Sequence, residues 1–200
     1  MMSKRALHAG IVGLVLSLSA CGMEPMNQVG DEESNDPSTI AAHVKDPRPG
    51  IIHLPIIGTI QGQSSWTGFN NMYGYELNTG WHVDSATIVY WDWKNSTPRT
   101  YGPFGGSGGA YCGHFECYGG SEWLVGVYGR SGSWIDQLGF VCADPNNPSV
   151  KYDLPACGGS GGSPFRSLCP DGYTIGQIGF LVSNVVYGLS VYCWDEINPS

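Results

Sequence analysis

The chain has 200 residues, of which 13% are charged and 12% are aromatic, and it contains 30 glycines. This composition favours short strands joined by tight turns over long helices. The formal charge is −8, and removal of residues 1–20 leaves 17 acidic against 7 basic residues, a charge of −10. Such a surface repels phosphate backbones, which argues against nucleic acid as a partner.

The N-terminus, residues 1–20, has the features of an export signal. Lys4 and Arg5 make its beginning positively charged, and the apolar run 11–18 follows them. This run is too short to span a bilayer as a helix. Segments of this kind direct export and are removed from the mature chain. The sequence therefore predicts a signal peptide over residues 1–20.

The signal ends in Leu18-Ser19-Ala20-Cys21, which resembles the bacterial lipobox. The resemblance implies that the chain is cleaved before Cys21 and that this cysteine is acylated, which would attach the protein to a membrane. Residue 22 is Gly rather than Asp, which in such lipoproteins favours the outer membrane over the inner one. We expect an exported protein of the bacterial envelope. The alternative is an ordinary signal peptide with a coincidental cysteine.

Residues 21–50 differ in composition from the rest of the chain. They contain the acidic cluster 31–36 and several prolines, and they are poor in aromatic residues. A segment of this kind cannot bury enough apolar surface to order itself. The sequence predicts a flexible tether here, which leaves residues 51–200 as the folded domain.

The segment 51–200 contains an internal repeat. Segments 80–90, 132–142 and 183–193 align without gaps, with 52 residues from Asp84 to Asp136 and 51 from Asp136 to Tyr187. Each copy places residues two apart, which is the period of a strand with one face in a core. These residues are Ala86, Ile88 and Tyr90, then Leu138, Phe140 and Cys142, then Leu189, Val191 and Cys193.

A second strand-like run precedes the repeated segments, as at 123–128 and 173–178. The turn between the two strands of a pair is short and rich in Gly, Ser or Asn, which predicts a hairpin. A small sheet cannot bury its apolar face alone. Three such sheets that face a common axis would bury all three faces, so the pattern indicates an all-β domain of three repeated sheets.

Two glycine motifs also repeat. The block 105–109 recurs as 158–162, and the nearest candidate in the first unit is 61–65. Gly-x-x-x-Asp occurs at 80–84 and 132–136, whereas the third copy has Ser183 and Tyr187 in place of the Gly and the Asp. A single Gly-x-x-x-Asp is more often a hairpin turn in which Gly takes a positive φ and Asp caps the loop. Two copies in register, each followed by a glycine block, favour a binding site.

Together with Tyr101-Gly102-Pro103-Phe104-Gly105, these motifs resemble the jacalin-related lectins over residues 51–200. The resemblance implies an all-β fold, the β-prism I of three Greek-key four-stranded sheets with pseudo-three-fold symmetry. In mannose-binding members of the family, a sugar lies between a Gly-x-x-x-Asp loop and the glycine loop that follows it. The Asp carboxylate accepts hydrogen bonds from two sugar hydroxyls, and main-chain N–H groups complete the site.

Carried over to this chain, the resemblance implies two carbohydrate-binding sites and none in the third unit. A carboxylate has two acceptor oxygens, hydrogen bonds to it are worth about 1.5–3 kcal/mol each, and glycines let the main chain approach a ligand. The side chains of Trp81, His82 and Trp134 are candidates to stack on the apolar face of a sugar. For the two tryptophans, the alternative is that strand alternation turns them inward. The first site comprises Gly80, Trp81, His82, Asp84, Gly105 and Gly106, and the second Gly132, Ser133, Trp134, Asp136, Gly158 and Gly159.

Six cysteines follow Cys21, and an even number in an exported domain favours disulfides over free thiols. Six cysteines allow fifteen pairings. The repeat favours Cys117–Cys142 and Cys169–Cys193 as equivalent bridges, which leaves Cys112–Cys157. The competing interpretation is a metal site, but the chain has no Cys-x-x-Cys pair and its histidines are scattered, so we expect no metal and no cofactor.

Both glycine blocks also match Gly-x-Ser-x-Gly, the nucleophile elbow of α/β-hydrolases, at Ser107 and Ser160. That motif needs a helix after the serine, and the sequence predicts none at either position, so we do not expect an enzyme. The sequence predicts a lipoprotein that binds glycans of the mannose or glucose type. The alternative is an envelope structural or protein-interaction module in which the loops are only turns. The sugar and the oligomeric state stay open.

Overall fold

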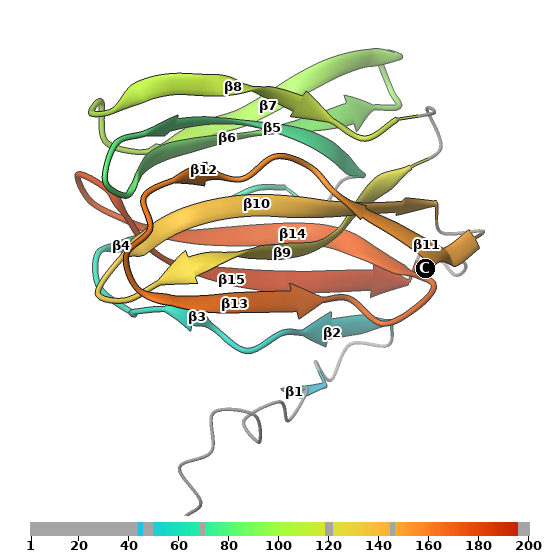
Figure 1. Ribbon diagram of the computed structural model, residues 1–200. Helices are drawn as coiled ribbons and strands as arrows, with labels where there is room; N and C mark the ends of the chain where they lie inside the picture. Colours follow the sequence, from blue (N-terminus) through green and yellow to red (C-terminus); the bar gives the residue numbers. More distant parts are fainter. Residues whose placement is uncertain (1–43, 46–49, 69–70, 119–121, 145–146, 196–200) are drawn as a thin grey trace, which may run out of the picture. The chain divides into compact units, whose positions relative to one another are not determined.

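The computed structural model describes residues 44–45, 50–68, 71–118, 122–144 and 147–195. The predicted signal peptide, Cys21 and most of the predicted tether lie outside these residues. Within them, fifteen strands form three antiparallel sheets (Figure 1). The described part of the chain holds no helix long and apolar enough to cross a membrane. The all-β, three-sheet prediction is confirmed.

The first two sheets are each built from one continuous stretch of chain. The first sheet has the order β7-β6-β5-β8 and the second the order β11-β10-β9-β13, with the short β12 also paired to β10. Because β11 and β12 pair with the same strand, together they occupy the place that β7 has in the first sheet. The strands are β5 (Met72–Thr79), β6 (Val83–Asp92), β7 (Thr97–Gly105), β8 (Ala110–Glu116), β9 (Trp123–Ser131), β10 (Ile135–Asp144), β11 (Asn147–Asp153), β12 (Cys157–Gly158) and β13 (Ser163–Leu168).

The third sheet joins the two ends of the domain. Its central hairpin comes from the end of the chain, and its outer strands come from the beginning (Figure 1). Strands β2 and β3 pair with β15, β4 pairs with β14, and β1 pairs with β2. The N-terminal strands thus complete the repeat unit that the C-terminal hairpin begins. The strands are β1 (Val44–Lys45), β2 (Ile51–His53), β3 (Ile57–Gly58), β4 (Gln63–Trp66), β14 (Tyr173–Val182) and β15 (Val186–Asp195).

This closure corrects the sequence alignment of the glycine loops. The segment 61–65 was the nearest sequence candidate for the missing copy, but the structural equivalent is 58–62. The Thr59 N–H donates to the carbonyl of Tyr187 at 3.0 Å. The N–H of Gly106 donates in the same way to the carbonyl of Asp84 at 2.9 Å. The loop at 58–62 therefore belongs to the third sheet and not to the first.

The inner faces of the three sheets form one core. Of the residues that the repeat predicts on this face, all are buried except Tyr90, which is half-buried. Aromatic rings join the sheets across the axis. Phe104 stacks on Phe180 with ring centroids 4.8 Å apart, and Tyr75 meets Phe140 at 4.6 Å. Such pairs stabilise a core by about 0.5–1.5 kcal/mol beyond the area that they bury.

All three disulfides connect neighbouring sheets. Two of them have the same place in the repeat, since each joins the residue after the last strand of one sheet to the second long strand of the next sheet. Loops of this size contribute roughly 3–4 kcal/mol each by the chain-entropy estimate. The pairs are the ones that the repeat favours, Cys112–Cys157, Cys117–Cys142 and Cys169–Cys193.

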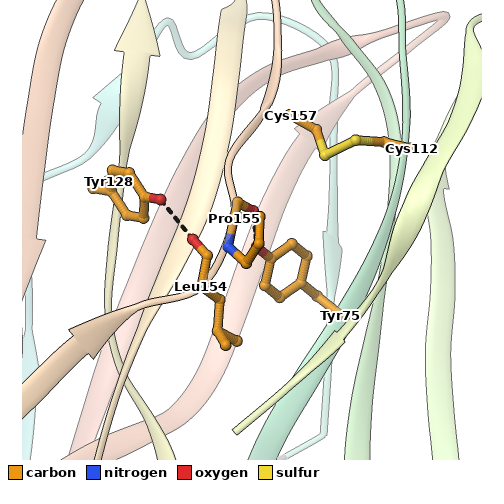
Figure 2. The surroundings of a disulfide bond; sticks show 6 residues. All are labelled: Tyr75, Cys112, Tyr128, Leu154, Pro155 and Cys157. Atoms are coloured by element: carbon orange, nitrogen blue, oxygen red, sulfur yellow. Dashed lines mark hydrogen bonds between the residues drawn. A yellow bond between two sulfur atoms is a disulfide. The ribbon is translucent and has the colours of Figure 1, made fainter.

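The segment between β11 and β12 is held by contacts from both sides (Figure 2). The Cys112–Cys157 disulfide ties it to β8 of the first sheet. The hydroxyl of Tyr75, on β5, donates to the carbonyl of Pro155, and the hydroxyl of Tyr128, on β9, donates to the carbonyl of Leu154 at 2.5 Å. These contacts fix the start of the second glycine loop relative to the first two sheets.

Candidate functional site

Three hairpin turns of the same local geometry connect the central strands of the three sheets. In each, the first residue of the turn donates its N–H to a carbonyl two residues later: Gly80 to His82 at 2.9 Å, Gly132 to Trp134 at 2.9 Å, and Ser183 to Val185 at 3.1 Å. The turns differ in the side chain that follows. It is Asp84 in the first sheet, Asp136 in the second and Tyr187 in the third.

The glycine loop of each of the first two sheets folds back over its turn. The Gly106 N–H donates to the carbonyl of Asp84 at 2.9 Å, and the Gly159 N–H donates to the carbonyl of Asp136 at 2.8 Å. The structure thus brings together each pair of motifs that the sequence predicts as one site. The amides of Gly106 and Gly159 are engaged within the protein and hold the loop in place.

The carboxylates lie against the last glycines of the loops. A Cβ added to Gly108 would lie 2.4 Å from Oδ1 of Asp84, and one added to Gly161 would lie 2.4 Å from Oδ1 of Asp136. No side chain fits at these distances. The next residue, Gly109 or Gly162, has a φ of 73° or 60°, in the left-handed region that glycine tolerates best. The glycines therefore allow the main chain to contact the carboxylate directly.

The two carboxylates are mostly buried but remain in contact with solvent. Asp84 is 8% exposed and Asp136 is 7% exposed. Oδ2 of Asp136 has no hydrogen-bond partner among the described residues, and Nε2 of His82 lies 3.6 Å from Oδ1 of Asp84. An unsatisfied buried acceptor costs about 1–3 kcal/mol, so the Asp136 carboxylate retains unused capacity to accept a hydrogen bond.

Aromatic rings border both candidate sites. Trp81 is 88% exposed and Trp134 is 41% exposed, so both face outward, which decides between the two orientations that the sequence left open. The rings of His82 and Trp134 come from the turns of two sheets, and their centroids lie 5.5 Å apart. The two sites therefore adjoin, and these rings are available to stack on the apolar face of a ligand.

Arg130, on β9, is a residue of the second site that sequence reasoning missed. Its Nε donates to the carbonyl of Gly161 at 2.8 Å and its Nη2 to the carbonyl of Gly162 at 2.7 Å, so it holds the loop beside Asp136. In the first sheet, Asn78 has this place and donates instead to Ser85 at 3.1 Å. The only sequence signal was a charged residue at the end of an otherwise apolar strand.

The turn of the third sheet has no carboxylate. Tyr187 stands in its place, and the hydroxyl of Tyr187 donates to Oδ1 of Asn184 at 3.4 Å. The loop that covers this turn has Thr59, Ile60 and Gln61 where the other two loops have Gly, Ser and Gly. The absence of a family-type site here stays a prediction.

The two Gly-x-Ser-x-Gly matches do not have the structural context of a nucleophile elbow. Ser107 lies between β7 and β8, and Ser160 lies between β12 and β13. A strand follows each serine, whereas the elbow requires a helix there. These serines belong to the loops that cover the turns.

Comparison with known proteins agrees with this geometry. The structure is similar to that of wild-type Malaysian banana lectin, with a TM-score of 0.58, 17% identity and coverage of 74% of this chain and 100% of that one. It is similar to a mannose binding jacalin related lectin from Ananas comosus, with a TM-score of 0.57, 17% identity and coverage of 73% and 99%. For artocarpin in complex with mannopentose the TM-score is 0.59, with 14% identity and coverage of 72% and 97%. No curated protein matches the chain in sequence.

The fold is the β-prism I of the jacalin-related lectins. Residues 68–141 match the family model of the jacalin-like lectin domain, so the resemblance seen in the sequence is confirmed. The match covers the whole first sheet and both Gly-x-x-x-Asp motifs. At the level of the family, it supports carbohydrate binding.

We predict that Gly108→Ala weakens ligand binding at the first site at least about tenfold, because loss of one hydrogen bond to a charged group suffices for that change. The added methyl group would displace the Asp84 carboxylate. The matched control is Ser183→Ala in the third turn, where no carboxylate follows. Both variants are measured by calorimetry in protein that also carries Asp136→Asn, which is expected to remove the second site, so that only binding at the first site is observed. Equal binding by both alanine variants would contradict this account.

Proposed function

We propose that the protein is a carbohydrate-binding lipoprotein of the cell surface, which binds glycans of the mannose or glucose type and does not transform them. The observation that carries the proposal is the contact of Asp84 and Asp136 with the main chain of their glycine loops. Two structural neighbours support the choice of sugar, since one is described as mannose binding and another is in complex with mannopentose.

The chemistry of the two sites fits adjacent sugar hydroxyls. Each carboxylate can accept hydrogen bonds from two hydroxyls, one at each oxygen, and each such bond to a charged acceptor is worth about 1.5–3 kcal/mol. The exposed rings of Trp81 and Trp134 cover the apolar face of a sugar. Among the residues placed at the two sites, none forms the pair of a nucleophile and a base that covalent catalysis requires, so we propose binding without turnover.

The lipid anchor is part of the proposal and rests on the sequence Leu18-Ser19-Ala20-Cys21. We infer that Cys21 is acylated and that residues 22–43, which precede strand β1 (Val44–Lys45), tether the domain at the envelope, in the outer membrane. Sites of this kind are individually weak, but two sites in a chain and many chains on one membrane raise the avidity by about 10²–10⁴. Display on a membrane is therefore consistent with the function.

The sugar sites are tested with the chain expressed without residues 1–20 and with Cys21→Ser, which prevents acylation, on a glycan array and by calorimetry with methyl α-mannoside. We predict that Asp84→Asn or Asp136→Asn removes one site each, and that the double variant lowers affinity beyond about tenfold, because the amide replaces a charged acceptor. Ser183→Ala is the matched control in the third turn and should bind as the parent does.

Sugar binding that survives both Asp substitutions would overturn the proposed sites. A glycan array without signal, together with a stoichiometric protein partner captured by crosslinking in cells, would instead favour the protein-interaction module that the sequence left as the alternative.

The anchor is tested in cells that express the full chain. We predict that the mature protein begins at Cys21, carries acyl chains detected by mass spectrometry and fractionates with the outer membrane. Cys21→Ser should abolish the acylation, whereas Gly22→Asp should move the acylated protein toward the inner membrane. An unacylated mature chain in the soluble fraction of wild-type cells would contradict the anchor.

A further inference from the structure

A cavity lies far from the sugar sites, at the opposite ends of the strands that carry them. It has a volume of about 470 Å³ and is lined by aromatic and acidic side chains. Its residues come from the start of β5, the end of β6 and the turn after it, the end of β8 and the start of β9. The lining includes Tyr73, Trp91, Trp93, Trp123, Glu116 and Glu122. We call it the aromatic cleft.

The indole rings of the aromatic cleft stand at steep angles to one another. Trp93 meets Trp91 with ring centroids 6.3 Å apart and an interplanar angle of 72°, and it meets Trp123 at 6.2 Å and 60°. Trp123 is 8% exposed and Trp93 is 64% exposed, so one ring lies deep and the other at the rim. Rings at such angles surround a compact ligand group, whereas a sugar ring stacks on a single flat face.

Two carboxylates give the aromatic cleft a negative charge, and none of the described residues that line it is basic. Both carboxylates already accept hydrogen bonds. Glu116 accepts from Nε2 of His114 at 2.7 Å, and Glu122 accepts from the hydroxyl of Tyr152. Burial, together with this hydrogen bond to Glu122, raises the pKa of Tyr152 to about 12, so its hydroxyl remains a donor at neutral pH.

The other titratable neighbours leave the aromatic cleft negative. Burial and the nearby Glu116 raise the pKa of Tyr73, which therefore stays neutral. His114 also pairs with Glu76 at 2.8 Å, and these hydrogen bonds raise its pKa. Even when His114 is protonated, it is shared between two carboxylates. The cleft thus offers negative charge and aromatic faces, and one oxygen of each carboxylate is already engaged in a hydrogen bond.

We propose that the aromatic cleft binds an organic cation of the quaternary ammonium type. Such a cation has no N–H group that must be satisfied, and it is attracted to indole faces and to nearby carboxylates. A primary ammonium, in contrast, must find acceptors for its three N–H groups, and one oxygen of each carboxylate is already engaged by His114 or Tyr152. This site is independent of the two sugar sites, so that either proposal can fail without the other.

The test is a titration with choline of the chain expressed without residues 1–20 and with Cys21→Ser, followed by calorimetry and by the indole N–H signals in NMR spectra. The neutral isostere 3,3-dimethyl-1-butanol has the same shape without the charge. We expect saturable binding of choline and at least about tenfold weaker binding of the isostere, because charge supplies the attraction. The affinities for phosphocholine and for a trimethyllysine peptide are then compared, to decide whether the natural cation is that of a lipid headgroup or that of a methylated lysine side chain.

Two variants locate the site. Trp93→Ala, at the exposed rim, should lower choline affinity at least about tenfold, while Trp81→Ala, an exposed tryptophan at the sugar sites, should leave it unchanged. Glu116→Gln with Glu122→Gln should remove the preference for choline over its isostere. Binding of methyl α-mannoside to Trp93→Ala reports that the fold is intact. The proposal would be overturned if choline and the isostere bound equally well. It would also be overturned if Trp81→Ala, but not Trp93→Ala, lost choline binding, or if binding of methyl α-mannoside required Trp93.

Discussion

A single main-chain hydrogen bond is repeated three times and determines the architecture of the candidate site. In each sheet, an amide at the start of a loop donates to the carbonyl of the residue after a hairpin turn: Gly106 to Asp84, Gly159 to Asp136, and Thr59 to Tyr187. Where that residue is Asp, the bond places its carboxylate under the last glycines of the loop. Without this bond, the two motifs would be separate turns.

The same loops also connect the sheets to one another. The first loop lies against the main chain of Asn184 and the second against that of Trp81, since an added Cβ on Gly106 or Gly159 would lie 2.2 or 2.3 Å from their carbonyl oxygens. The third loop reaches the second turn through the hydroxyl of Thr59, which donates to the carbonyl of Ser133 at 3.1 Å. Each loop thus touches its own turn and that of a neighbouring sheet, so the pocket geometry depends on the whole prism.

The internal repeat made most of the fold predictable from the sequence. The core-facing residues, the three cysteine pairs and the two pairs of glycine motifs occur where the alignment indicates. The closure of the third sheet was missed because its outer strands are short and its loop has Thr59, Ile60 and Gln61 instead of glycines. The direction of Trp81 was undecided because a residue in a hairpin turn does not follow strand alternation. Arg130 and the aromatic cleft were missed because their partners lie in other strands and become neighbours only in the fold.

The central claim is that each Asp and its glycine loop form one pocket for adjacent hydroxyls, and a crystal structure of the protein with methyl α-mannoside tests it most directly. The account predicts a sugar at each of the first two turns, with two hydroxyl oxygens within about 3 Å of the carboxylate of Asp84 or Asp136, and no sugar beside Tyr187. A mannoside bound elsewhere, with both carboxylates untouched, would contradict it.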